Sequence, residues 1–316
     1  MPIFKIEKDK FKRIKEKNFD YERDMQALVE KNLEEVFGLE FVSGALNKEF
    51  SVKNQHQALY MDTLAYDPQS NSFVIIEYKK GSSYSVIDQG YAYLSGMLNN
   101  KADFVLEYNE RKGKNIKKDS IDWSQSRVIF ISREFTPYQK GAIEFRDLPF
   151  ELWEIQLLED NILALNAIKA AQTQESITKL SKGVKAIDEV SKEIQTFTID
   201  DHYKKASPEI VKLLNKYRDN IFYIDENVKE KAVKNYLGYK LNWYNFVSIH
   251  VYKEKLRIYV RKTKLENDIE KRLFTKVPTS YEWGKTPLWW VDVHDDKDIE
   301  YIMKAIKESY ENAPDR

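Results

Sequence analysis

Hydrophobic positions recur at helical spacing near the start of the chain and then at strand spacing. Across residues 21–37 six apolar side chains fall on one face of a helix, and Gly38 follows, where helices commonly end. Residues 59–66 and 73–78 are apolar enough for strands, and segment 67–72 between them is rich in turn-forming residues. The pattern predicts a helix followed by a β-hairpin.

The same pattern continues towards residue 150 with alternating element types. Residues 86–98 have helical periodicity, residues 104–108 and 128–132 have the short apolar character of strands, and residues 136–145 fit a short helix. A hairpin followed by helices and further strands is typical of a mixed sheet with crossover connections. We therefore predict a central mixed sheet flanked by helices.

A polar segment without proline follows this first region. Residues 159–196 contain a single glycine, and Ile177, Leu180, Val184 and Ile187 are spaced by 3, 4 and 3 residues. This heptad pattern is shorter than the three to four heptads that identify a coiled coil. Two interpretations remain open, a helical connector that packs on one domain and a coil that joins two copies of the chain into a homodimer.

The last third of the chain has the pattern of a small α+β domain. Ser207-Pro208 is a suitable N-cap and first residue for a helix over residues 209–220. Residues 246–252 and 256–260 alternate as a hairpin, and residues 288–310 fit a strand followed by a helix. We predict a first domain over residues 1–158, a helical connector over residues 159–200 and an α+β domain over residues 201–316.

Composition narrows the class of protein. The 316 residues include 51 basic and 51 acidic side chains, so attraction to a polyanion must come from local patches. No cysteine is present, which excludes disulfides and thiolate metal sites. The first residues lack the apolar core of a signal peptide, and no apolar run approaches the roughly 20 residues of a membrane span. We expect a cytoplasmic protein with no membrane contact.

Three charged residues stand out against their apolar strands. Alternation places Glu77 and Lys79 on the same side of their strand, with Tyr78 facing the other way, and hairpin pairing brings Asp62 near Glu77. Two neighbouring carboxylates repel each other and favour a divalent cation such as Mg²⁺ or Mn²⁺. An adjacent lysine then activates a water or stabilises charge on a phosphate. The alternative is a structural ion-pair cluster.

Asp62 followed by Glu77-Tyr78-Lys79 resembles the signature of the PD-(D/E)xK nuclease superfamily, although Met61 stands where that signature often has proline. Downstream, the segment from Gln89 to Tyr93 fits the Q-x-x-x-Y motif of the RecB-like branch. The resemblance covers about residues 20–155. It implies a restriction-endonuclease-like α/β fold and a Mg²⁺-dependent nuclease that acts on DNA, in DNA repair or in defence against foreign DNA.

The resemblance also implies roles for individual residues. Asp62 and Glu77 would bind the metal with the carbonyl of Tyr78 nearby, and Lys79 would be the catalytic lysine. A glutamate on the preceding helix often completes such sites, and Glu30 is the candidate with Glu34 as its rival. Gln89 and Tyr93 would lie near the metal or the DNA backbone.

Two local patches are basic enough to hold a polyanion. Residues 5–17 contain seven basic and three acidic side chains, and residues 108–118 contain five and one. Such runs either track phosphates or are solvated surface. From the second patch we predict nucleic-acid contacts by Lys112, Lys114, Lys117 and Lys118.

The C-terminal third is dense in aromatic residues. These side chains either stack on nucleic-acid bases or pack in the apolar core of the domain and at its edge. It resembles an uncharacterised module found beside nuclease-like domains. Two other function classes therefore stay open for the whole chain. One is a nucleic-acid-binding protein that has the nuclease fold without turnover, and the other is a regulatory protein dimerised through the connector.

Overall fold

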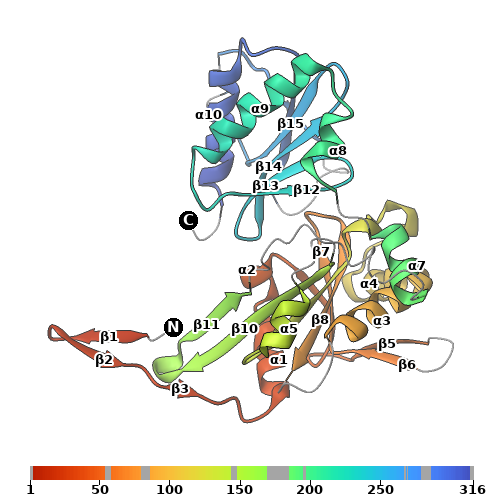
Figure 1. Ribbon diagram of the computed structural model, residues 1–316, viewed down its shortest axis with the longest axis vertical. Coiled ribbons are helices and arrows are strands. Elements are labelled where there is room, and N and C mark those ends of the chain that lie inside the picture. Colours follow the sequence, from red (N-terminus) through yellow and green to blue (C-terminus); the bar gives the residue numbers. More distant parts are fainter. Residues whose placement is uncertain are drawn as a thin grey trace. The chain divides into compact units, whose positions relative to one another are not determined.

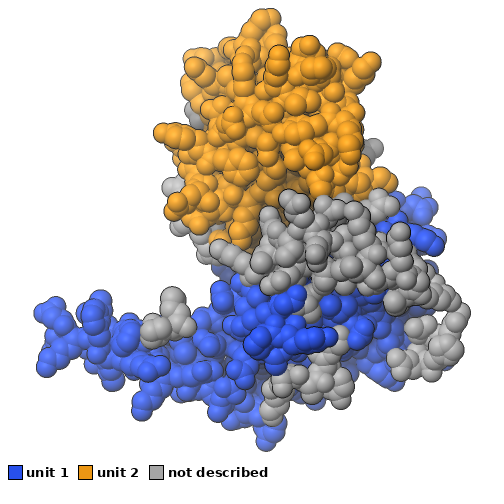
Figure 2. All heavy atoms as spheres, viewed as in Figure 1, with its two compact units in different colours: residues 1–67, 71–194 blue, residues 68–70, 195–316 orange. Residues whose placement is uncertain are grey.

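The computed structural model describes residues 3–53, 58–79, 86–143, 148–168, 185–194, 197–266, 268, 270–278 and 286–313. The chain forms two compact units, shown in different colours in Figure 2. Unit 1 comprises residues 1–67 and 71–194, and unit 2 comprises residues 68–70 and 195–316.

A mixed sheet forms the centre of unit 1. Within the described residues its strand order is β11-β10-β9-β8-β7-β4, with β3 on β10 as a seventh strand (Figure 1). Strands β8, β9 and β10 are parallel to one another, and the remaining pairs are antiparallel. The strands are β3 (Glu16–Lys17), β4 (Glu40–Ser43), β7 (Thr63–Asp67), β8 (Ser72–Lys79), β9 (Arg127–Ser132), β10 (Phe150–Leu158) and β11 (Leu163–Ala167).

Helices cover both faces of this sheet. On one face α1 (Glu22–Lys31) and α2 (Leu33–Phe37) form an apolar cluster with alternate residues of β8 and β9. The other face packs against α3 (Val86–Asn99), α4 (Lys101–Lys112) and α7 (Lys185–Glu193). Short elements on this side are α5 (Pro137–Ala142), η1 (Lys118–Ser120) and η2 (Trp123–Gln125). The predicted mixed sheet flanked by helices is confirmed.

Three local predictions differ from the structure. The predicted helix over residues 21–37 breaks at Asn32, and α2 ends at Gly38 in the left-handed conformation. The predicted strand over residues 104–108 was wrong, because Phe104 and Tyr108 lie four residues apart on the buried side of α4.

The predicted helical connector is also only partly helical. Residues 159–167 form the turn η3 (Glu159–Asn161) and strand β11, which belongs to the sheet of unit 1. Helix α7 packs on α3 and buries Ile187 and Val190 in the unit 1 core. The other three heptad positions, Ile177, Leu180 and Val184, lie outside the described residues.

Unit 2 is a separate antiparallel sheet with helices, as the alternating pattern predicted. Its described strands are ordered β12-β13-β14-β15-β17-β16, and α9 and α10 contribute to its apolar core. The hairpin aliphatics from Val247 to Val260 are buried. Strands are β12 (Lys229–Ala232), β13 (Leu237–Leu241), β14 (Tyr244–Val251), β15 (Leu256–Arg261), β16 (Thr275–Lys276) and β17 (Leu288–Val293); helices are α8 (Ile199–Tyr203), α9 (Pro208–Phe222) and α10 (Ile299–Glu311).

Two further two-stranded ribbons belong to unit 1. Strands β5 (Phe50–Lys53) and β6 (Ala58–Met61) lie beside α3, and β1 (Phe4–Glu7) and β2 (Lys10–Arg13) form a hairpin that projects from the body of the unit (Figure 1). None of the helices in the described part of the chain is both long and apolar enough to cross a membrane.

Candidate active site

The C-terminal end of β8 carries the residues that the sequence singled out. Glu77 and Lys79 pair in register with Phe130 and Ser132 of β9 and share the sheet face covered by α3. The Tyr78 side chain points to the opposite face, where it is buried in the cluster formed with α1. Alternation along one strand therefore separates the charged pair from the tyrosine between them.

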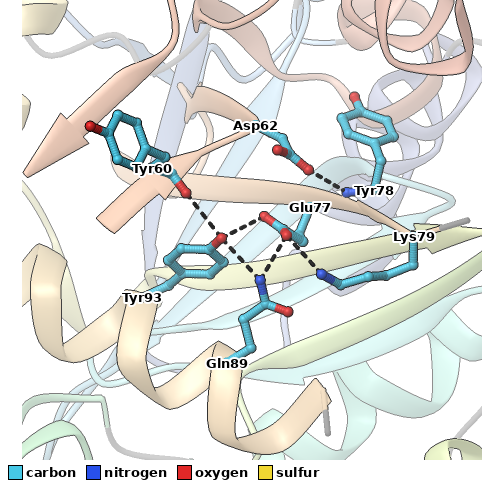
Figure 3. A network of polar contacts seen from close by, with 7 residues as sticks. All are labelled: Tyr60, Asp62, Glu77, Tyr78, Lys79, Gln89 and Tyr93. Atoms are coloured by element: carbon cyan, nitrogen blue, oxygen red, sulfur yellow. Dashed lines mark hydrogen bonds and ion pairs between the residues drawn. The ribbon is translucent and has the colours of Figure 1, made fainter. Parts of the chain in front are cut away.

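Glu77 is held by three side-chain donors. Its Oε1 accepts hydrogen bonds from Lys79 Nζ at 2.8 Å and from Gln89 Nε2 at 2.7 Å, and its Oε2 lies 2.8 Å from the Tyr93 hydroxyl (Figure 3). Gln89 and Tyr93 come from successive turns of α3, because i and i+4 residues share a helical face. The Glu77 side chain is 7% exposed, so these donors replace most of its water.

The Tyr93 hydroxyl connects Glu77 to the ribbon that precedes the site. It lies 3.0 Å from the Tyr60 carbonyl oxygen as well as 2.8 Å from Glu77 Oε2, so its one proton serves either acceptor. Burial and the Glu77 charge raise the pKa of Tyr93, which keeps the hydroxyl protonated as a donor.

Asp62 follows β6 and precedes β7, directly before the residue that pairs with Ile76 of β8. Its Oδ2 accepts a hydrogen bond from the Tyr78 main-chain N at 2.9 Å (Figure 3). Burial and the nearby charge of Glu77 raise the pKa of Asp62 to about 7, against the lowering effect of that hydrogen bond. Within the described residues, its Oδ1 has no hydrogen-bond donor.

Glu30 does not join these two carboxylates. It lies on α1, and its side chain accepts hydrogen bonds from Gln26, Thr63 and the main-chain N atoms of Ala45 and Leu46. Because Thr63 pairs with Ile76, this cluster occupies the α1 face, whereas Glu77 faces α3. Across the described part of the chain, no three His, Cys, Asp or Glu side chains group around a metal position.

The rival Glu34 is exposed on α2. The predicted nucleic-acid contacts Lys112, Lys114, Lys117 and Lys118 are also exposed. Lys117 and Lys118 are close in sequence to Ser120, whose carbonyl oxygen accepts a hydrogen bond from the side chain of Asn71, the residue immediately before β8. The lysine patch therefore lies near the start of β8, and the candidate site lies at its end.

Gly44 packs against Glu30 and the main chain of Asp62, a contact that sequence reasoning missed. A Cβ at this position would lie 2.1 Å from Glu30 Oε1 and 2.9 Å from the Asp62 carbonyl oxygen. The loop after β4 can approach both residues only without a side chain. A single glycine after a predicted strand gives no sequence signal for this contact, because its neighbours come from distant parts of the chain.

The chain is 34% identical over 309 residues to a protein of Haemophilus influenzae (strain ATCC 51907 / DSM 11121 / KW20 / Rd) named "Uncharacterized protein", covering 98% of this chain and 99% of the relative. The two proteins belong to one family. Residues 199–313 match the family described as "Domain of unknown function (DUF5655)", which agrees with the uncharacterised module predicted there.

Among solved structures, the crystal structure of a repair endonuclease from Pyrococcus abyssi matches 44% of this chain. The match spans 50% of that chain, at 21% sequence identity and a TM-score of 0.22.

Proposed function

We propose that this protein is a metal-dependent deoxyribonuclease that hydrolyses phosphodiester bonds, as would serve DNA repair or defence against foreign DNA. The observation that carries the proposal is the meeting of Asp62, Glu77 and Lys79 at the end of β8, with Gln89 and Tyr93 bonded to Glu77. These are the five side chains that the nuclease motifs select.

The donor set suits a hard divalent cation. Mg²⁺ is usually held by one or two carboxylates, with waters and substrate phosphates as its other ligands. Asp62 and Glu77 supply two carboxylates, and burial together with the charge of Glu77 raises the pKa of Asp62, an effect that a bound cation would offset. A Mg²⁺ or Mn²⁺ ion held there, with the Tyr78 carbonyl nearby, would lower the pKa of a bound water and neutralise charge on the phosphate.

The remaining residues position these groups. The Lys79 ammonium lies 2.8 Å from Glu77, and its side chain is 17% exposed, so it is fixed yet open to a ligand. In the proposed reaction it stabilises negative charge that develops on the phosphate oxygens. Gln89 and Tyr93 fix the Glu77 carboxylate, and the Tyr78 main-chain N fixes Asp62, so little reorganisation is needed when DNA binds.

The test is cleavage of single-stranded, double-stranded and modified DNA, and of RNA, with Mg²⁺ or Mn²⁺. We expect Asp62→Ala, Glu77→Ala and Lys79→Ala each to lower the rate by about a hundredfold or more. Asp295 and Lys297 form an exposed ion pair in unit 2 and are two residues apart, as Glu77 and Lys79 are, so Asp295→Ala and Lys297→Ala are matched controls and should retain activity.

Equal cleavage by the wild type and the three site variants would refute the proposed site. DNA binding without cleavage under every metal condition would instead identify a nucleic-acid-binding protein with a silent site. No nucleic-acid binding, together with a dimer that requires residues 159–196, would favour the regulatory alternative.

A further inference from the structure

The β1–β2 hairpin is an arm whose two strands pair with each other and, among the described residues, with no other strand. Both strands are exposed at every position, with Ile6 71% and Phe11 78% exposed. Lys8 and Asp9 form its two-residue turn with positive φ angles of 47° and 62°, as in a type I′ turn that matches the twist of a hairpin. An isolated two-stranded hairpin is marginally stable in water, so this arm is suited to binding another molecule.

The two faces of the arm differ in chemistry. Pairing of Phe4 with Arg13 and of Ile6 with Phe11 places the apolar side chains on one face. Lys5, Lys10 and Lys12 lie on the other face together with Glu7. Lys5 pairs with Asp160 at 3.2 Å and with Glu7 at 3.5 Å, and Lys12 lies 3.9 Å from Glu7. Such exposed pairs contribute little, so the lysines stay available to a polyanion.

The base of the arm lies at the same end of the sheet as the candidate site. At Leu157, one edge of β10 is paired with Leu163 of β11. Lys17 of β3 must therefore pair with Leu157 on the opposite edge of β10, the edge that pairs with β9 over residues 150–154. Strand β3 therefore follows directly beyond the end of β9.

The sheet register gives the spacing between the arm and the site. Lys79, Ser132 and Glu154 lie side by side across β8, β9 and β10, and Leu157 is three residues further along β10. At a rise of about 3.3 Å per residue, Leu157 and its partner Lys17, at the base of the arm, lie on the order of 10 Å beyond Lys79 along the strand direction.

A basic concavity marks the base of the arm. It has a volume of about 590 Å³ and is lined by five basic side chains, Lys5, Lys12, Arg13, Lys15 and Lys17, beside Glu159 and Asp160. The segment of residues 5–17 carries seven basic and three acidic side chains in a chain whose formal net charge is zero. Charge complementarity therefore favours a polyanion as the partner of this arm.

We propose that the β1–β2 hairpin is a DNA-binding arm that enters the major groove of a duplex and holds it beside the candidate active site. The proposal rests on the proposed nuclease function for the identity of the polyanion. A two-stranded ribbon fits the major groove, which is about 12 Å wide. The lysines contact the flanking phosphates, and Phe4, Ile6 and Phe11 contact thymine methyl groups and sugars.

Binding of a fluorescent 20-base-pair duplex, measured by anisotropy in EDTA at several salt concentrations, tests the arm apart from catalysis. The triple variant Lys5→Ala, Lys10→Ala, Lys12→Ala should weaken binding by about tenfold or more and lower the slope of log Kd against log salt by about two to three. The triple variant Lys229→Ala, Lys264→Ala, Lys304→Ala removes the same charge from exposed positions of unit 2 and should bind within about twofold of the wild type.

The double variant Ile6→Ser, Phe11→Ser tests the apolar face at constant charge. It should weaken duplex binding with the salt slope unchanged, and circular dichroism should show the wild-type fold in every variant. Wild-type affinity in both arm variants would overturn the proposal. Equal losses on single-stranded and duplex DNA would refute groove insertion, and a wild-type dimer dissociated by the double variant would show that the arm binds a second copy.

The two proposals fail in different ways. Arm-dependent duplex binding without metal-dependent cleavage refutes the nuclease alone. Cleavage that is lost in the Lys79 variant but unaffected in the arm variants refutes the arm alone.

Discussion

Asp62 and Glu77 are adjacent carboxylates held in unequal ways. Glu77 accepts hydrogen bonds from Lys79, Gln89 and Tyr93, whereas Asp62 accepts one from the Tyr78 main chain. The charge of Glu77 is thus compensated locally, and that of Asp62 is only partly compensated. In the proposed nuclease site, this uncompensated charge would lower stability in exchange for affinity for a cation.

Replacing Asp62 by Asn should therefore stabilise the protein while abolishing cleavage. Because the pKa of Asp62 is raised from 3.8 to about 7, the folded state loses stability as the pH rises from 3.8 to about 7, and the full loss is present above pH 7. An asparagine Oδ1 can still accept from Tyr78 N without carrying charge. At pH 8 without divalent cations we expect the free energy of unfolding in urea to rise by about 1–3 kcal/mol.

At pH 5 the gain from Asp62→Asn should shrink, because wild-type Asp62 is then protonated in the folded state. Asp295→Asn, at an exposed ion pair in unit 2, is the control and should give no gain at either pH. A lower stability of Asp62→Asn at pH 8 would contradict the proposed repulsion.

Among the elements, α3 determines the geometry of the site, because it carries both Gln89 and Tyr93. Gly90 allows this helix to lie against β10, since a Cβ there would be 2.5 Å from the ring of Phe150. Alanine at an exposed helical position gains about 1 kcal/mol over glycine, but here the overlap with a buried ring outweighs that gain.

Gly90→Ala should lower the free energy of unfolding by about 1–3 kcal/mol and reduce cleavage, because α3 must move away from β10. In a Phe150→Leu background the added methyl group has room, so the same change should be nearly neutral. Urea unfolding of the four proteins gives the coupling energy between the two positions. Additive effects of the two substitutions would show that the cost of Gly90→Ala does not come from overlap with the Phe150 ring.

The local part of the site was predictable because it depends on short-range geometry. Strand alternation places Glu77 and Lys79 together, and helical spacing does the same for Gln89 and Tyr93. Glu30 was not predictable in this way, because its place depends on which sheet face α1 covers. The segment 104–108 shows the same limit, since a five-residue segment that is apolar except for Glu107 fits a strand or a buried helical turn.

At the scale of the molecule, the two units have their own apolar cores, so the chain need not unfold in a single transition. Their ionisable groups also differ. Asp62, whose pKa is strongly raised, belongs to unit 1. His202 and His250, whose pKa values are lowered, belong to unit 2. Through these groups, a fall in pH stabilises unit 1 at Asp62 and destabilises unit 2 at its two histidines.

His250 should make unit 2 less stable as the pH falls. Its ring lies between those of Tyr236 and Tyr259, and burial together with the Arg257 charge lowers its pKa from 6.5 to about 4. Above pH 6.5 the ring is neutral in both states, and its full stabilising effect is present. Between pH 6.5 and 4 the unfolded chain binds a proton that the folded state excludes, which removes on the order of 3 kcal/mol.

Urea unfolding of the wild type and of His250→Gln, followed by tryptophan fluorescence between pH 7.5 and 4.5, measures this effect. Trp243, Trp289 and Trp290 report on unit 2, and Trp123 and Trp153 on unit 1. The variant should lose most of the pH dependence of the unit 2 transition, with the remainder assigned to His202. The exposed His294→Gln is the matched control and should keep the wild-type dependence. An unchanged slope in His250→Gln would place the acid sensitivity of unit 2 elsewhere.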